Sequence, residues 1–211
     1  MAVTPGAPGA RTRKTLIYGG LIAWVAACVV LGCYLLATHL LTLPAPAPAD
    51  PVLHHGITAH RRTEQRERWL VLHVVYDECK CSQRVLDHLL ADRRPPGLAE
   101  RVVLVTEHRD ASAALIAAIP AHGFELDVVT PEQLVAEYHI EAAPLLVIVD
   151  PQDAVRYVGG YTPRKQAADV RDLAVIAAVQ RGETVEPLPT FGCAIGAALS
   201  SRLDPLGIRP D

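Results

Sequence analysis

Three cysteines outside the apolar N-terminal region could carry out thiol chemistry. Cys79 and Cys81 are separated by one residue within the sequence 76–82, and Cys193 lies near the C-terminus. A cysteine at the beginning of a helix faces unpaired backbone N–H groups, which favour the thiolate, the form that attacks disulfides. The two acidic residues before Cys79 oppose this effect, whereas Lys80 supports it. The pair is therefore a candidate redox site, and the alternative is an inert structural pair.

The three cysteines allow more than one pairing. A disulfide between Cys79 and Cys81 would close a small, strained ring, and strained disulfides are easily reduced. A bridge from Cys193 to either of them would close a loop of about 110 residues and would be a stable bond, provided that residues 187–192 fold back over the site. We expect Cys79–Cys81 to be the working couple and Cys193 to be an auxiliary thiol that exchanges with it. An incidental buried thiol is the alternative for Cys193.

The elements that must position these cysteines alternate between strands and helices. Short apolar, β-branched runs predict buried strands, and longer runs with apolar residues on one face predict helices. Thr130 and Pro131 are typical of a helix start, as are Thr162 and Pro163. The expected strands are 69–76, 101–106, 124–129, 145–149 and 154–158, and the expected helices begin near residues 80, 110, 130 and 162. This order predicts an α/β sandwich with a central mixed sheet.

A second motif lies before the strand at 145–149. Tyr138, Ile140 and Pro144 are followed by an apolar strand, a turn at 150–153 and a returning strand with Gly159. This arrangement resembles the second half of the thioredoxin-like fold, and the resemblance covers about residues 69–181. It implies that Pro144 is a cis proline opposite the redox cysteines, which only an X–Pro bond adopts cheaply. It also implies that Ala143 binds an extended peptide substrate through its backbone.

The resemblance extends to a subgroup, with one departure. The segment 106–130 resembles the insertion of membrane-tethered periplasmic thioredoxin-like reductases. Cys-Lys-Cys-Ser at 79–82, together with Thr-Phe-Gly-Cys at 190–193, is similar to RedB-type thioredoxin-like proteins. Thioredoxins carry Cys-x-x-Cys, often after a tryptophan, whereas this chain carries Cys-x-Cys after acidic residues.

The N-terminal region predicts a membrane anchor. Residues 16–43 hold no Asp, Glu, Lys or Arg, and about 20 apolar residues suffice to cross a bilayer as a helix. Arg11, Arg13 and Lys14 precede the span, so residues 1–15 should stay in the cytoplasm and the rest should be exported. A cleaved signal peptide is the alternative, because residues 47–49 form an Ala-x-Ala pattern. Cys28 and Cys33 lie within the span, and we interpret them as apolar filler.

After the anchor we expect a linker at 44–68, a thioredoxin-like domain at 69–182 and an extension at 183–211 that carries Cys193. The Pro/Ala run at its beginning, up to Pro51, should be extended and semi-rigid, and a polar stretch follows it. Its His54, His55 and His60 are interpreted as solvated side chains rather than as metal ligands. The net charge of −3 in 211 residues gives no reason to expect a nucleic-acid partner.

The function expected from these features is thiol–disulfide oxidoreduction outside the cytoplasm, in the bacterial inner membrane and facing the periplasm. The partners would be protein thiols or disulfides, with no cofactor and no metal. Two alternatives remain: a copper(I) chaperone that uses Cys79, Cys81 and a third donor, and a redox-silent adaptor that uses the same peptide groove. In the resembled family Pro144 occupies the space of a metal, which disfavours copper. A peroxidase is not expected, because there is no Thr-x-x-Cys loop.

Overall fold

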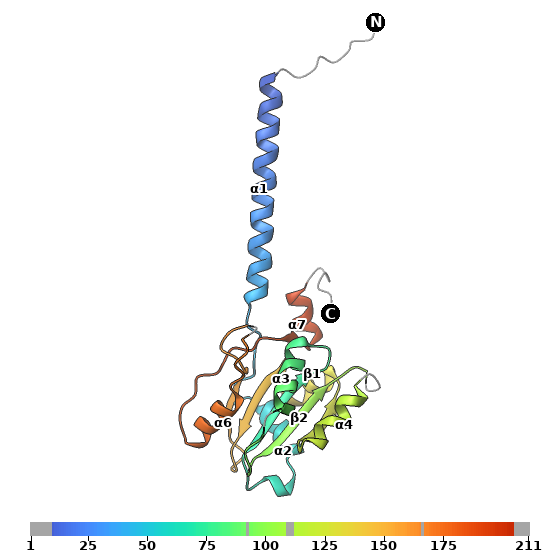
Figure 1. The fold of residues 1–211 in the computed structure, drawn as a ribbon, viewed down its shortest axis with the longest axis vertical. Coiled ribbons are helices and arrows are strands. Elements are labelled where there is room, and N and C mark those ends of the chain that lie inside the picture. Colours follow the sequence, from blue (N-terminus) through green and yellow to red (C-terminus); the bar gives the residue numbers. More distant parts are fainter. Residues whose placement is uncertain (1–9, 92, 109–111, 166, 205–211) are drawn as a thin grey trace. The chain divides into compact units, whose positions relative to one another are not determined.

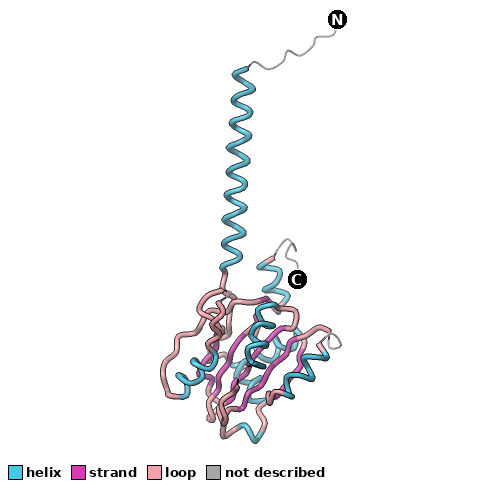
Figure 2. Tube along the Cα trace, in the orientation of Figure 1, coloured by secondary structure: helices cyan, strands magenta, loops and turns pink. Residues whose placement is uncertain are grey.

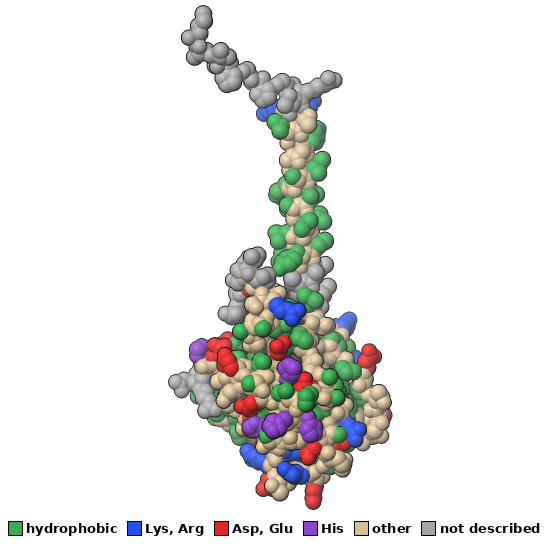
Figure 3. Space-filling model, turned by 180° about the vertical axis from the view of Figure 1, so that it is seen from behind, with side chains coloured by type: hydrophobic (Ala, Val, Ile, Leu, Met, Phe, Trp, Pro, Cys, Tyr) green, Lys and Arg blue, Asp and Glu red, His purple; other side chains and the backbone are tan. Residues whose placement is uncertain are grey.

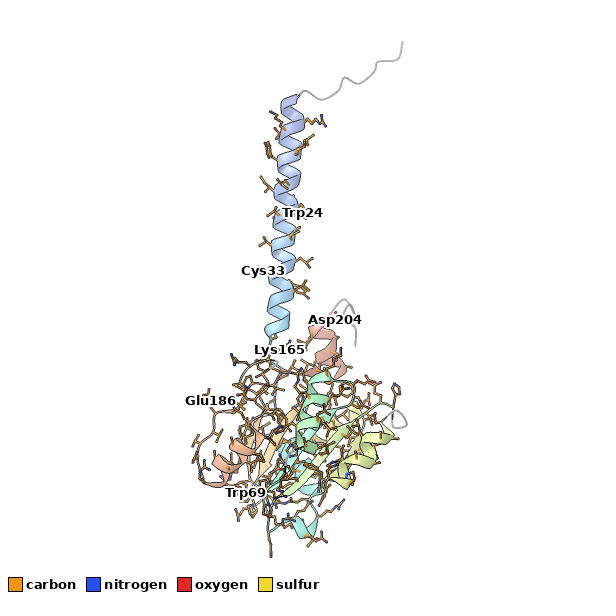
Figure 4. The ribbon with its side chains drawn as sticks, in the orientation of Figure 1. Trp24, Cys33, Trp69, Lys165, Glu186 and Asp204 are labelled. Atoms are coloured by element: carbon orange, nitrogen blue, oxygen red, sulfur yellow. The ribbon has the colours of Figure 1, made fainter. Side chains whose placement is uncertain are left out.

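The computed structural model describes residues 10–91, 93–108, 112–165 and 167–204. It divides into two units, Met1–Leu41 and Thr42–Asp211. The first contains helix α1, Ala10–Leu40, whose stretch Arg13–Leu35 is long and apolar enough to cross a membrane. The residues of this stretch are exposed, and Trp24 and Cys33 project from the helix (Figure 4). The apolar region predicted at 16–43 is therefore helical to Leu40.

The second unit is built on a five-stranded sheet in the order β3-β2-β1-β5-β6 (Figure 2). Strands β1, β2 and β3 are parallel, whereas β5 runs antiparallel to β1 and β6 antiparallel to β5. Their bounds are Leu70–Tyr76 for β1, Ala99–Val105 for β2, Glu125–Val129 for β3, Leu145–Val149 for β5 and Val155–Gly159 for β6. The predicted mixed sheet is confirmed. A separate pair of short strands joins β4, Ala142–Ala143, to β7, Cys193–Ala194.

Helices cover both faces of the sheet (Figure 1). One face packs on α2, Pro51–His60, and α5, Pro131–Tyr138. The other packs on α3, Lys80–Ala91, α4, Ala113–Ala121, and α6, Asp172–Gln180. A 3-10 turn, Thr63–Gln65, precedes β1, and helix α7, Ala197–Leu203, follows β7. Because side chains of a strand alternate between faces, the apolar strands supply both cores at once.

The prediction that residues 44–68 are a linker before the folded domain is wrong for residues 51–60, which form α2. Asp50 caps this helix by accepting hydrogen bonds from the N–H groups of Val52 (2.9 Å) and Leu53 (3.0 Å). Leu53 and Ile57, four residues apart and hence on one helix face, are buried in the core against α5. The folded unit therefore begins before Trp69.

The prediction that Thr162 and Pro163 begin the last helix is also wrong. The Thr162 hydroxyl donates to the carbonyl of Arg164 (3.0 Å) instead of accepting from a helical N–H group. The N–H of Arg171 donates to the carbonyl of Tyr161 (2.9 Å), which closes the loop between them, and α6 begins at Asp172.

A charged network is buried beside the α3 and α6 face. Arg94 binds Glu100 through Nε and Nη2 and binds Asp172 through Nη1 (2.7 Å). His73, in the middle of β1, contacts Glu100 (3.2 Å) and the hydroxyl of Tyr161 (2.9 Å). Burial alone would raise the pKa of both carboxyls, but their partners leave the pKa of Glu100 and of Asp172 below the ordinary value. Arg94 thus neutralises two buried carboxylates at once.

Candidate functional site

Cys79 lies where β1 meets α3. The N–H of Cys79 donates to the carbonyl of Tyr76 (3.0 Å), and its carbonyl accepts from the N–H of Gln83 (2.9 Å), so it immediately precedes the first helical turn. Its sulfur also accepts hydrogen bonds from the N–H groups of Cys81 and Ser82. These are the unpaired helix N–H groups that the sequence predicted for this cysteine.

The loop before β5 closes over Cys79. The Ala143–Pro144 peptide bond is cis, as the resemblance implied, and Ala143 is fully buried. The Cys79 thiol lies 3.8 Å from the carbonyl oxygen of Ala143. The exposed fraction of Cys79 is 0%, so solvent does not reach it. The structure thus brings Cys79, Ala143 and Pro144 together.

Cys193 arrives at the same place from the C-terminal segment. Strand β7 runs antiparallel to β4 and places Cys193 opposite Ala143. The next residue along β7 pairs with Ala142, and the N–H of Ile195 donates to the carbonyl of Glu141 (2.7 Å). The fold-back of the C-terminal segment, which the sequence left conditional, is present in the structure.

The three sulfurs share one hydrogen-bond cluster. The thiol of Cys193, and after it the thiol of Cys81, donates to the Cys79 sulfur and lowers the pKa of Cys79 well below its usual range, although burial acts against this. The same contact raises the pKa of Cys81 and of Cys193, because the thiol that donates the hydrogen bond is stabilised in its protonated form. Cys79 is therefore the cysteine of the three that ionises most readily.

Two basic side chains act on the partly exposed members of the cluster. The charge of Lys165, on the loop after β6 (Figure 4), favours the ionised form of both Cys81 and Cys193, and the charge of Arg84 on α3 favours that of Cys81. These effects are smaller than the rise caused by Cys79. They give the outer side of the cluster a positive environment.

Two glycines, Gly160 and Gly192, allow the C-terminal segment to pack closely, and the sequence analysis did not identify them as part of the site. A Cβ at Gly192 would lie 1.8 Å from the carbonyl oxygen of Ala143 and 2.6 Å from Cδ of Pro144. A Cβ at Gly160 would lie 2.1 Å from the carbonyl oxygen of Pro189. Both glycines allow backbones to approach closely, and the signal available in the sequence was only their position next to Cys193 and Gly159.

The three histidines of the segment that was predicted to be a linker lie outside this site. His54, His55 and His60 are exposed on α2, on a face where histidines gather (Figure 3). Nε2 of His60 lies 3.2 Å from Glu137, and its ring stacks on Tyr138. Among the residues that the structure describes, no group of three or more His, Cys, Asp or Glu side chains is arranged to hold a metal ion.

Comparisons with known proteins identify structural neighbours only. No protein-family model matches the chain, and no curated protein matches it. An uncharacterized conserved protein from Geobacillus kaustophilus is 18% identical, with a TM-score of 0.49 over 74% of this chain and 90% of its own. A hypothetical protein from Sinorhizobium meliloti is 20% identical, with a TM-score of 0.48 over 62% and 80%. StoA from Bacillus subtilis is 14% identical, with a TM-score of 0.37 over 44% and 72%.

The thioredoxin-like assignment is carried by the features of the chain itself. The strand order β3-β2-β1-β5-β6, the helix that begins directly after Cys79 and the cis proline before β5 together form the predicted arrangement. The fold is therefore thioredoxin-like, with one apolar N-terminal helix in addition.

Proposed function

We propose that this chain is a membrane-tethered thiol–disulfide oxidoreductase that exchanges disulfides with protein partners outside the cytoplasm. The observation that carries the proposal is the state of Cys79. It is a buried cysteine at a helix start, it lies against the cis-proline loop, and two neighbouring thiols stabilise its thiolate. A stabilised thiolate is both an attacking group and a good leaving group in disulfide exchange.

The exchange conserves electrons and needs no cofactor. A thiolate of the protein attacks a partner disulfide, a mixed disulfide forms, and one partner thiolate leaves. A second thiol of the cluster, once deprotonated, attacks the mixed disulfide and releases the other partner sulfur. The partner gains two electrons and the protein ends with an internal disulfide. The reverse sequence oxidises a partner dithiol.

The N-terminal helix supports the proposed location. Arg13–Leu35 is one candidate span. Arg11, Arg13 and Lys14 stand at its N-terminal end, whereas the first basic residues after it are Arg61 and Arg62. This supports a cytoplasmic N-terminus and a folded unit on the outer side of the inner membrane, where disulfides persist. The Cys-Lys-Cys-Ser and Thr-Phe-Gly-Cys sequences support a place among RedB-type proteins.

The two alternatives have less support. A copper(I) site needs Cys79, Cys81 and a third donor arranged around one ion, and the described residues offer no group with that arrangement. A redox-silent adaptor would bind peptides at Ala143, but the backbone of Ala143 is already paired with Cys193.

The test is disulfide exchange by the full chain in detergent micelles. The reduced protein is mixed with a disulfide-bonded peptide in a glutathione buffer, and free peptide thiols are counted over time. We expect exchange by the wild type, unchanged exchange by the matched control Cys33→Ala, and loss of at least 100-fold in Cys79→Ser. Equal rates in Cys79→Ser and the wild type would refute the proposal.

A further inference from the structure

The C-terminal segment 188–196 is fixed across the cis-proline loop at both ends. At the N-terminal end of the segment, the carbonyl of Leu188 accepts a hydrogen bond from the N–H of Gly160 (2.8 Å). The carbonyl of Thr190 accepts one from the N–H of Leu43 (2.8 Å). At the C-terminal end of the segment, Ile195 is buried in the apolar core that includes side chains of α2 and α5. The segment is therefore part of the folded unit.

This segment occupies the position that an extended peptide would take. Strand capture requires free backbone groups along one edge. Here Cys193 already pairs with Ala143, and Gly192 lies so close to the carbonyl of Ala143 that no side chain fits between them. A partner cannot add a strand at Ala143 while the segment is in place.

The three cysteines differ in their exposure to solvent. Cys79 is fully buried, whereas Cys81 and Cys193 are partly exposed. Both Cys81 and Cys193 act on the Cys79 sulfur, and Cys193 has the larger effect. Cys193 lies opposite Ala143 in the β4–β7 pair, and the carbonyl oxygen of Ala143 is 3.8 Å from the Cys79 sulfur, so Cys193 reaches Cys79 from outside α3. A Cys79–Cys81 bond would close a small, strained ring, whereas a Cys79–Cys193 bond would not.

We propose that Cys193 is the sulfur that exchanges with partners and that Cys79–Cys193 is the working couple. This rests on the proposed function and differs from the sequence-based expectation of a Cys79–Cys81 couple. Recognition then does not depend on an extended peptide at Ala143. The partners are proteins that present an accessible dithiol or disulfide to the outer side of Cys193.

The steps balance in either direction. For oxidation of a partner, a partner thiolate attacks the Cys193 sulfur of the Cys79–Cys193 disulfide, and the Cys79 thiolate leaves. A second partner thiolate attacks the partner sulfur of the mixed disulfide, and Cys193 leaves as a thiolate that takes up a proton. The partner loses two electrons and the couple gains them. For reduction of a partner, the same steps run backwards and Cys79 resolves the mixed disulfide.

The electrostatics agree with these roles. A leaving thiolate of low pKa departs faster. Cys193 is bonded to the partner sulfur when Cys79 leaves, but the Cys81 thiol and the N–H groups of Ser82 and Cys81 still lower the pKa of Cys79, which favours it as the leaving group of the couple. The hydrogen bond to Cys79 and burial raise the pKa of Cys193, and the charge of Lys165 acts against this rise.

The experiment uses the full chain in micelles with Cys28 and Cys33 replaced by alanine. The oxidised protein is digested without reduction and its disulfide is mapped by mass spectrometry. A peptide with one cysteine, activated as the mixed disulfide with 5-thio-2-nitrobenzoate, then serves as the partner. We expect a Cys79–Cys193 disulfide in the oxidised protein. We expect the peptide to stay trapped on Cys193 in Cys79→Ser, and peptide capture to fall at least 10-fold in Cys193→Ser.

Two results would overturn this pairing while the proposed function stands. One is an oxidised protein linked through Cys79–Cys81. The other is capture of the peptide on Cys79 in Cys193→Ser at the wild-type rate. A Cys79–Cys193 disulfide that still forms in Cys81→Ser would support the proposal, because Cys81 is not a member of the couple. A protein that exchanges with no peptide in any variant would overturn the proposed function and this inference together.

Discussion

Replacing Gly192 by alanine should release the C-terminal segment from the site. The added Cβ would lie 1.8 Å from the carbonyl oxygen of Ala143, and real Cβ contacts are not shorter than 3.0 Å. The neighbouring atoms belong to the backbone and to the ring of Pro144, so neither can rotate away. The two strands must separate by roughly 1 Å, and overpacking of this kind costs about 1–3 kcal/mol. Because each 1.4 kcal/mol is a factor of ten, the open population should rise about 5- to 150-fold.

The assay is alkylation of Cys79 in the reduced full chain in micelles. Labelling of a sealed thiol follows the population of the locally open state when opening is fast, so the rate should rise by the same factor. Gly196→Ala is the matched control, since its Cβ would meet only side-chain atoms at 3.5 Å or more in the same segment. Mass spectrometry of the Cys79 peptide gives the rate, and far-UV circular dichroism checks the fold. Equal labelling in Gly192→Ala, Gly196→Ala and the wild type would show that the segment does not seal Cys79.

Three further perturbations have defined outcomes. Cys193→Ala should raise the pKa of Cys79 by roughly one to two pH units, because a hydrogen bond to a charged group contributes about 1.5–3 kcal/mol. Since the folded pKa of Cys79 lies below the ordinary value, its contribution to stability is fully present above about pH 8.5 and is lost as pH falls through the folded value. Thiolate absorbance at 240 nm against pH measures the shift, and an unchanged titration would contradict the cluster. Arg94→Met should reduce the free energy of unfolding by about 3–5 kcal/mol in urea, because Glu100 and Asp172 lose their common partner; a loss under 1 kcal/mol would contradict that accounting. An alkaline phosphatase fused to the C-terminus should be active only if the folded unit is exported, and inactivity beside an active cytoplasmic reporter at the same position would reverse the topology.

The parts of the fold that local sequence determines were predictable. Each buried strand is an apolar run long enough to identify, and Thr130 forms the expected capping box with Gln133 at the start of α5. Cys79 follows a strand and begins a helix, so its environment of backbone N–H groups follows from its position alone. Pro144 was recognised because the residues on both sides of it form a recurring pattern.

The parts that depend on long-range packing were not predictable in the same way. Helix α2 was missed because histidines and a preceding Pro/Ala run concealed two apolar residues four positions apart and the Asp50 cap. Strand β7 has two residues, too few to show any periodicity, and its position is fixed by contacts with segments far away in the sequence. Cys193 is more than 100 residues from Cys79, so its proximity depends on contacts that sequence spacing does not encode.

The position of β7 changes how the two other cysteines should be interpreted. From sequence alone, Cys81 is the natural partner of Cys79, since only one residue separates them. In the folded unit, closeness along the chain is a poor guide, because Cys193 acts on the Cys79 sulfur more strongly than Cys81 does. Cys193 comes beside Cys79 because β7 pairs it with Ala143, whose carbonyl oxygen lies 3.8 Å from the Cys79 sulfur. Cys81 is not consumed when Cys79 and Cys193 join, so its thiol can donate a hydrogen bond to the Cys79 thiolate whenever reduction of the couple releases it. A cysteine that remains a thiol throughout the cycle would explain why three sulfurs gather at a site whose chemistry needs two.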